Sequence, residues 1–282
     1  MVLSACQEDN GPETPQFAGP QDRGLVANAL ITEASGLVVS RSNASLLWTH
    51  NDSGDPARLF LLTNTGEDRG TYTLENAQNQ DWEDLALAAR QGVNYLHIAD
   101  IGDNASSRPE IQVYRLAEPD VSQVSTPQSQ TIAAGQIEKI RLQYPDGPRD
   151  AETLLVNANG DIYIISKEAG QAGLYRAAYP QSLTNLNTLE KIGSLSLGEV
   201  VGGDAGNGIL LKTYTQIFYW PPPATNAADF GSRILQTTPF EVNYVPEPQG
   251  EALAWLPGET GYFTLSEELL GTPARLYFYG QL

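Results

Sequence analysis

The chain has 282 residues, of which 41% are hydrophobic and 9% aromatic, enough for a sizeable core. Thirty-four acidic residues against sixteen basic ones give a formal charge of −18, which disfavours nucleic acid and anionic membrane surfaces as partners. The single cysteine excludes an intrachain disulfide and a thiolate metal cluster. No run of residues approaches the roughly eighteen apolar positions that a membrane helix needs.

The N-terminus carries that cysteine. Leu3-Ser4-Ala5-Cys6 matches the end of a bacterial lipoprotein signal, in which small residues precede the cysteine that receives lipid. The polar stretch that follows, Gln7 to Pro20, contains Pro and Gly and is typical of a flexible tether. We therefore predict a signal remnant and tether over 1–22 and one domain over 23–282. The expected location is the bacterial cell envelope or its exterior, with lipid at Cys6 as the only membrane contact.

Short apolar runs with β-branched or aromatic members, bounded by Gly, Asn, Asp or Pro, predict strands. In chain order the clearest are Ser45–His50, Val93–Ala99, Gly160–Ser166 and Gly261–Ser266. One unit recurs: an acidic residue, a short apolar strand, a turn, a second strand ending in a polar cluster, and a third strand with an aromatic residue. The acidic positions of its five copies are Glu33, Glu83, Glu152, Asp204 and Glu251.

The copies recur at about fifty residues, the size of a four-stranded propeller blade. Segments 70–74, 137–142, 189–193 and 240–244 supply fourth strands, and 24–31 would complete the last blade and close the ring. We therefore predict an all-β fold, a β-propeller with five four-stranded antiparallel blades. Residues 120–134 form an insertion or a faint sixth blade, so six or seven blades stay open, and a pair of β-sandwiches is the alternative.

The first strand of each blade lines the channel of a propeller, so the acidic residues of the copies are expected to meet there. Carboxylates crowded in a channel raise one another's pKa unless a cation lies between them. Ca²⁺ is the expected ion, because the sequence offers few nitrogen or sulfur ligands. The predicted metal ligands are Glu33, Glu83, Glu152, Asp204 and Glu251 from the first strands, with Asp52, Asp100, Asp103 and Glu267 from the ends of the second. Alternatively, these side chains cap turns or pair with basic residues.

Three basic side chains near these positions are candidates for catalysis. Lys167 and Lys212 stand at corresponding ends of second strands and could hold a phosphate ester or another anion beside a metal. His50, also on a second strand, could serve as general base. The structural alternatives are charge balance for the lysines and core packing for the histidine. No nucleophile elbow, nucleotide-binding glycine loop or HExxH zinc motif occurs.

Four segments, Trp48–Asp55, Asp81–Ala86, Ile98–Asn104 and Pro248–Ala254, together resemble an uncharacterised family of secreted or lipid-anchored bacterial propeller proteins. The segment Pro248–Ala254 is also similar to a sequence motif of phytase-like and calcium-dependent phosphotriesterase-type propellers. This similarity implies calcium binding and phosphoester chemistry by analogy alone.

Two functions remain open from the sequence. The first is a calcium-dependent hydrolase that acts on a phosphoester or related small anion at the channel mouth. The second is a non-catalytic binding or scaffold propeller that recognises a protein, peptide or glycan. We expect the chain to act as a monomer in either case.

Overall fold

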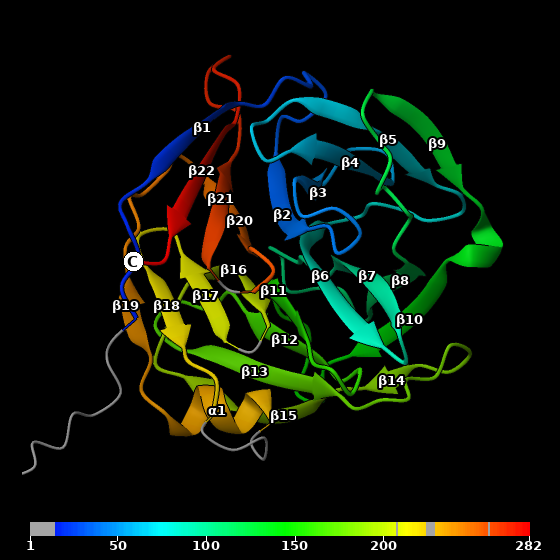
Figure 1. Ribbon diagram of the computed structural model, residues 1–282. Coiled ribbons are helices and arrows are strands. Elements are labelled where there is room, and N and C mark those ends of the chain that lie inside the picture. The colour runs from blue at the N-terminus through cyan, green and yellow to red at the C-terminus, as the bar shows by residue number, and fades with distance from the viewer. Residues whose placement is uncertain (1–14, 207, 224–228, 259) are drawn as a thin grey trace, which may run out of the picture.

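The structure, a computed structural model, describes residues 15–206, 208–223, 229–258 and 260–282. Its five small sheets stand around one axis, with the innermost strand of each sheet toward the middle (Figure 1). The chain is a five-bladed β-propeller, and the predicted fold class is confirmed. Cys6 and most of the predicted tether lie outside the described residues.

The first four blades each run outward from the axis in chain order, apart from strands added at the outer edge. From the axis outward, blade one contains β2 (Ala34–Val39), β3 (Leu46–Asn51), β4 (Arg58–Thr63), β5 (Asp68–Leu74) and β9 (Gln128–Ile132). Blade two contains β6 (Trp82–Arg90), β7 (Val93–Asp100), β8 (Ile111–Ala117), β10 (Glu138–Gln143) and β14 (Asn187–Thr188). Blade three contains β11 (Ala151–Val156), β12 (Ile162–Ser166), β13 (Ala172–Ala177) and β15 (Glu190–Leu195). Blade four contains β16 (Val200–Ala205), β17 (Ile209–Thr213), β18 (Ile217–Trp220) and β19 (Phe240–Val242).

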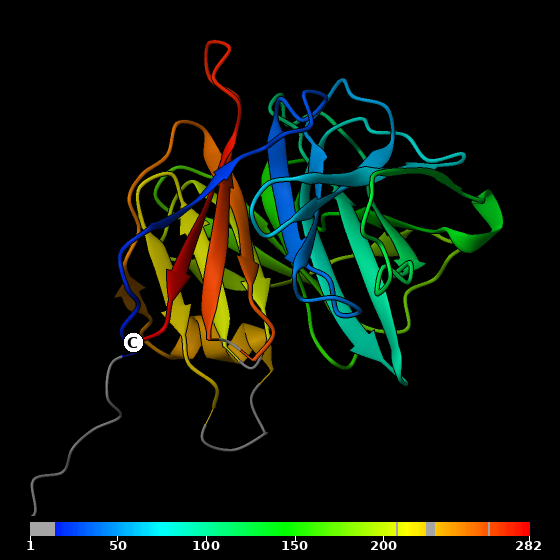
Figure 2. The same ribbon diagram turned by 45° about the horizontal axis from the view of Figure 1, so that its top comes forward.

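The fifth blade is completed by the N-terminal strand. It contains β20 (Gly250–Trp255), β21 (Gly261–Ser266) and β22 (Arg275–Gly280), and β1 (Gln21–Leu25) pairs antiparallel with β22 along its outer edge (Figure 2). The predicted closure of the ring is therefore confirmed, although the strand lies at 21–25 rather than 24–31. Phe17 is buried against the rings of Trp255 and Tyr262, so part of the segment assigned to the tether packs on this blade.

Segment 120–134 does not form a sixth blade. Its strand β9 pairs parallel with β5 at the outer edge of blade one, and β14 pairs parallel with β10 in the same way. Two blades therefore have five strands instead of the predicted four. The helices in the described residues are a 3-10 turn, η1 (Ala134–Gln136), and α1 (Phe230–Gln236), which the Asp229 side chain caps by accepting from Ser232 N. Among the described residues, no helix is long and apolar enough to cross a membrane.

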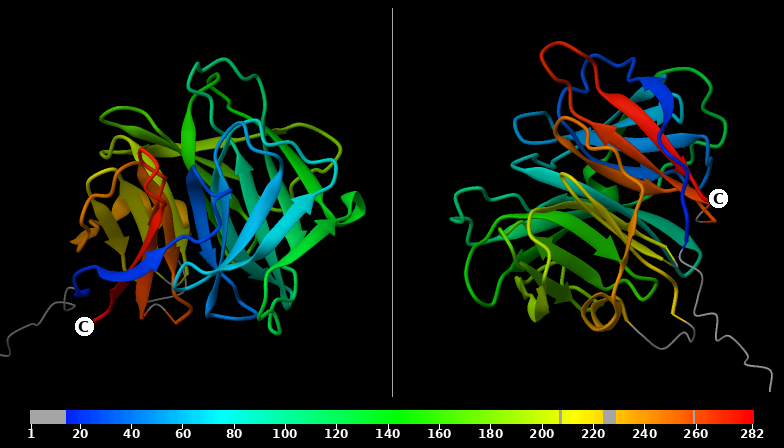
Figure 3. Two further views of the ribbon diagram at one scale, coloured as in Figure 1. Left: turned by 90° about the horizontal axis from the view of Figure 1, so that it is seen from above. Right: turned by 90° about the vertical axis from the view of Figure 1, so that its left-hand side faces the viewer.

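A bulge near the start of each inner strand positions the side chains of the channel. The pairing between inner and second strand shifts between Trp82 and Asp84 in β6, between Ala151 and Thr153 in β11, and between Gly250 and Ala252 in β20. The residues inside these three bulges are Glu83, Glu152 and Glu251. A bulge bends the strand and redirects the side chain that it carries. Because the three bulges lie at the same end of their strands, these glutamates meet at one end of the propeller. Figure 3 shows the five blades in two further views.

Candidate metal centre

Three glutamates from three blades converge at one end of the channel. Glu83, Glu152 and Glu251 are 3%, 3% and 5% exposed, respectively. One carboxylate oxygen of each lies within 4.8 Å of an oxygen of the other two. The structure thus brings together three of the five first-strand residues that the repeat singled out.

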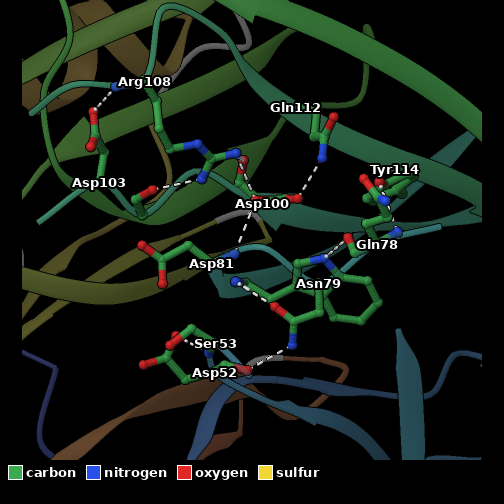
Figure 4. Close-up of polar contacts among 12 residues, drawn as sticks. Asp52, Ser53, Gln78, Asn79, Asp81, Asp100, Asp103, Arg108, Gln112 and Tyr114 are labelled. Atoms are coloured by element: carbon green, nitrogen blue, oxygen red, sulfur yellow. Dashed lines mark hydrogen bonds and ion pairs between the residues drawn. The ribbon is translucent and has the colours of Figure 1, made fainter. Parts of the chain in front are cut away.

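A second group of carboxylates shares Glu83. Oxygens of Asp52, Asp81 and Glu83 also lie within 4.8 Å of one another. Asp52 follows β3 and Asp81 precedes β6, and the Asn79 side chain between them donates a hydrogen bond of 2.6 Å to the backbone carbonyl of Asp52 (Figure 4). We call the five residues Asp52, Asp81, Glu83, Glu152 and Glu251 the acidic centre. Asp81 was not predicted as a ligand.

Glu83 is the least compensated member of the acidic centre. Its carboxylate accepts no hydrogen bond and forms no ion pair with any described residue. Burial, together with the negative charge of Glu152, raises its pKa well above the usual value. Gly102 packs so closely here that a Cβ would lie 2.1 Å from Glu83 Oε1 and 2.6 Å from Asp81 Oδ2. An ionised carboxylate in such a place is costly unless a cation lies beside it.

One ammonium group reaches the acidic centre. Lys167 Nζ donates to Glu152 Oε1 and, at 2.8 Å, to the Tyr214 hydroxyl, which in turn donates to Glu251 Oε1 at 2.9 Å. The pKa of Lys167 is raised because the attraction of Glu152 outweighs the opposing effect of burial. Glu152 Oε2 remains buried without a hydrogen-bond partner in the described part of the chain. In the described part of the chain, Lys167 is the one basic residue that bonds to a carboxylate of the acidic centre, while Lys212 and Arg108 act on Glu251 and Asp81 electrostatically.

The mouth of the channel is also acidic. Burial raises the pKa of Asp52 to about 7, with smaller contributions from Asp81, Glu251 and Glu33. Burial, followed by the charges of Glu251 and Asp52, likewise raises the pKa of Glu267 to about 7. Glu267 and the exposed Glu33 thus act on the acidic centre electrostatically, but neither belongs to its two groups of mutually close oxygens.

Two predicted first-strand ligands lie outside the acidic centre because the inner strands differ in register. In blade one the bulge holds Ser35, whose hydroxyl donates to the Glu83 carbonyl at 2.5 Å, and Glu33 precedes the strand. In blade four the bulge holds Val201, and Asp204 stands three residues further along β16. The Asp204 carboxylate accepts from Ala205 N at 2.7 Å and Trp255 N at 2.8 Å, so it joins blades four and five.

Asp100 and Asp103 are engaged by Arg108. The guanidinium of Arg108 lies 2.8 Å from Asp100 Oδ1, and Gln112 donates to the other Asp100 oxygen at 2.5 Å (Figure 4). Asp103 Oδ2 accepts from the backbone N of Arg108 at 2.7 Å. The structure therefore places these two carboxylates in the alternative roles of basic pairing and turn capping.

Of the three candidate catalytic residues, only Lys167 reaches the acidic centre. His50 has no exposed surface. Its Nδ1 lies 2.9 Å from the Asn51 carbonyl, its ring packs edge-on against Trp82 at 5.5 Å, and burial lowers its pKa to about 4. Lys212 is also fully buried; its ammonium donates to the Gly250 carbonyl, and burial lowers its pKa to about 8. The structural alternative of core packing accounts for His50.

No family model and no curated protein matches the chain. Similar solved structures include a calcium-binding protein, regucalcin, from Agrobacterium tumefaciens strain C58, with TM-score 0.47, 11% identity and 94% of each chain covered. Others are a gluconolactonase from Xanthomonas campestris, with TM-score 0.44, 11% identity and 96% of this chain and 98% of that chain covered, and a streptogramin B lyase, with TM-score 0.42, 10% identity and coverages of 94% and 98%. At these identities and scores, the similarity does not indicate what this chain binds.

Proposed function

We propose that the acidic centre binds a divalent cation, Ca²⁺, with Glu83 as the central ligand. The observation that carries this proposal is the Glu83 carboxylate, which is buried, unpartnered among the described residues and common to both groups of close oxygens. Ca²⁺ binds oxygen ligands at about 2.3–2.6 Å, so oxygens on opposite sides of one ion stand about 5 Å apart. The spacing of 4.8 Å or less in each group suits this arrangement. The donors are all carboxylates, which favour a hard cation.

We further propose that the site hydrolyses a small anionic ester such as a phosphoester. A bound Ca²⁺ would supply Lewis-acid polarisation of the ester. Lys167 would hold the anion: two of its three N–H donors are used by Glu152 and Tyr214, and its side chain is 20% exposed. Tyr214 orients the ammonium group through its own bond to Glu251.

A structural role for the ion is the second candidate. Glu83, Glu152 and Glu251 come from blades two, three and five, so an ion between them would connect inner strands that are far apart in sequence. In that case the propeller would be a non-catalytic scaffold whose rim recognises a protein, peptide or glycan.

Calcium titration of chelator-treated protein by calorimetry tests the metal site. We expect stoichiometric Ca²⁺ binding by the wild type and its loss in Glu83→Gln. Glu199→Gln, at an exposed glutamate outside the acidic centre, is the matched control and should bind normally. Absence of Ca²⁺ binding to the wild type would contradict the proposal.

A panel of phosphomonoesters, phosphodiesters and other anionic esters then separates the two roles. Turnover that requires Ca²⁺ and is lost in Lys167→Met, while Ca²⁺ binding remains, supports the hydrolase. Ca²⁺ binding without turnover of any panel member supports the scaffold.

We propose that the protein is a monomer held at the bacterial envelope by lipid on Cys6. Metabolic labelling with a fatty acid in wild type and Cys6→Ser, with fractionation of the cells, tests the attachment. Size-exclusion chromatography with light scattering tests the monomer.

A further inference from the structure

A separate cavity lies on the fifth blade. Its volume is about 340 Å³, and it opens between the segment 245–248 that leads into β20 and residues 266–273, which begin at the last residue of β21. This volume falls within the range of small-molecule sites, about 300–1,000 Å³. None of the residues that line it belongs to the acidic centre.

The cavity wall contains two carboxylates that form no ion pair with a described residue. Glu247 is 9% exposed; its Oε1 accepts from the Thr264 hydroxyl, and its Oε2 has no hydrogen-bond partner within the described chain. Lys212 lies near enough to act on Glu247 electrostatically, but its ammonium donates to the Gly250 carbonyl. The half-buried Glu267 also forms no side-chain hydrogen bond with a described residue. A buried carboxylate without a partner favours a cationic ligand.

The one guanidinium in the wall is already neutralised. Arg275 forms an ion pair with Asp22 of β1, so it does not compensate the two glutamates. The charge of this cavity is therefore negative, as is that of the whole chain.

The remaining wall is apolar and aromatic. It is formed chiefly by Pro246, Pro248, Leu269, Pro273, Tyr277 and Tyr279. The Tyr279 hydroxyl accepts from Val245 N at 3.2 Å, which fixes the segment that carries Glu247 against β22. Proline and tyrosine surfaces accommodate a flat apolar body, and tyrosine rings also attract cations.

We propose that this cavity binds a small organic cation, an amine with an aromatic or aliphatic body, whose ammonium pairs with the half-buried Glu267 and is attracted by the charge of the more deeply buried Glu247. The body packs on the prolines and on Tyr277. The cavity shares no lining residue with the acidic centre, but its Glu267 interacts electrostatically with Glu251 and Asp52.

Three ligands with one indole body and different charge test this proposal. Tryptamine, tryptophol and indole-3-propionate are titrated into the full chain at pH 8 by calorimetry, with chelator and with Ca²⁺. We expect tryptamine to bind at least tenfold more tightly than tryptophol, with indole-3-propionate the weakest. Equal binding of all three would show apolar adsorption only and overturn the proposal, as would no binding of tryptamine.

Substitutions in the cavity wall and in the acidic centre test where the amine binds. Glu267→Gln should weaken tryptamine binding about tenfold and leave tryptophol binding unchanged, whereas Tyr277→Ala should weaken both and Tyr277→Phe neither. Melting curves show whether each variant is folded, and Glu267→Gln keeps the test informative if a change at the more buried Glu247 prevents folding. Glu83→Gln should retain tryptamine binding. If Glu83→Gln abolishes binding while Tyr277→Ala and Glu267→Gln do not, the amine binds at the acidic centre and the proposal is wrong.

Discussion

Glu83→Gln should be more stable than the wild type without calcium and less stable than the wild type with calcium. Without metal, burial raises the pKa of Glu83 in the folded protein. A raised carboxyl pKa costs stability as the pH increases from the unfolded-state pKa to the folded-state pKa, and this cost persists at higher pH. Glu83→Gln keeps the shape and removes the ionisation. At pH 8 in chelator, we therefore expect the variant to be more stable than the wild type by about 1–3 kcal/mol.

Calcium should invert that order. A ligand at one hundred times its dissociation constant stabilises the folded state by about 2.7 kcal/mol. Each kcal/mol of stabilisation raises the melting temperature of a chain of this size by about 2–4 °C, so calcium should raise the melting temperature of the wild type by about 5–11 °C. Glu83→Gln should gain little, because it has lost the ligand shared by both groups of oxygens.

Differential scanning calorimetry in chelator and in CaCl₂ measures both effects, with Glu199→Gln as the control that should follow the wild type. If Glu83→Gln melts below the wild type in chelator and gains as much melting temperature from calcium as the wild type does, Glu83 is neither a destabilising charge nor a calcium ligand.

Three further predictions follow from the same geometry. Gly102→Ala should lower the free energy of unfolding by about 1–3 kcal/mol and weaken Ca²⁺ binding, because its methyl group would collide with Glu83 Oε1. Gly135→Ala, which has open space around it, is the control and should change neither quantity when both are measured by calorimetry. Lys167→Met should tighten Ca²⁺ binding roughly fivefold, about 1 kcal/mol, since the ammonium no longer competes for Glu152; weaker binding would contradict this. Ca²⁺ affinity measured between pH 8 and pH 6 should fall as the Asp52 carboxyl, with its pKa of about 7, takes up a proton, and a flat profile would speak against Asp52 as a ligand.

The five-bladed ring could be predicted from the sequence because its repeat is long and each copy ends in a clear turn. The position of β1, the strand that closes the ring, could not be predicted in the same way. The apolar residues Val26 and Ile31 indicated a strand over 24–31, but they are buried in the core beside blade one while β1 ends at Leu25. Apolar side chains that fill a gap between sheets have the same sequence pattern as a strand.

The acidic centre was predictable only where the acidic residue falls inside the bulge. Glu83, Glu152 and Glu251 do so, whereas Ser35 and Val201 occupy the equivalent bulges of blades one and four. Register depends on backbone pairing, and a shift of a few residues along a strand moves a side chain by about 3.3 Å per residue.

The loop before each inner strand carries a repeat signal of its own. Asp81 stands two residues before the bulge residue Glu83, and Glu33, Asp150 and Glu199 stand two residues before the bulge residues Ser35, Glu152 and Val201, so an alignment of the copies on their bulges would have singled out this position. Arg108 lies in the loop between β7 and β8 and forms the ion pair that engages the predicted ligand Asp100, a contact that the strand pattern alone did not indicate.

Anomalous diffraction from crystals grown with Ca²⁺, or with a lanthanide in its place, would locate the ion proposed in the acidic centre. We expect a peak within about 2.3–2.6 Å of a Glu83 carboxylate oxygen, with at least one further carboxylate of the acidic centre in contact. A channel without such a peak under these conditions, with Glu83 held by a side chain of the protein instead, would contradict the proposed calcium site.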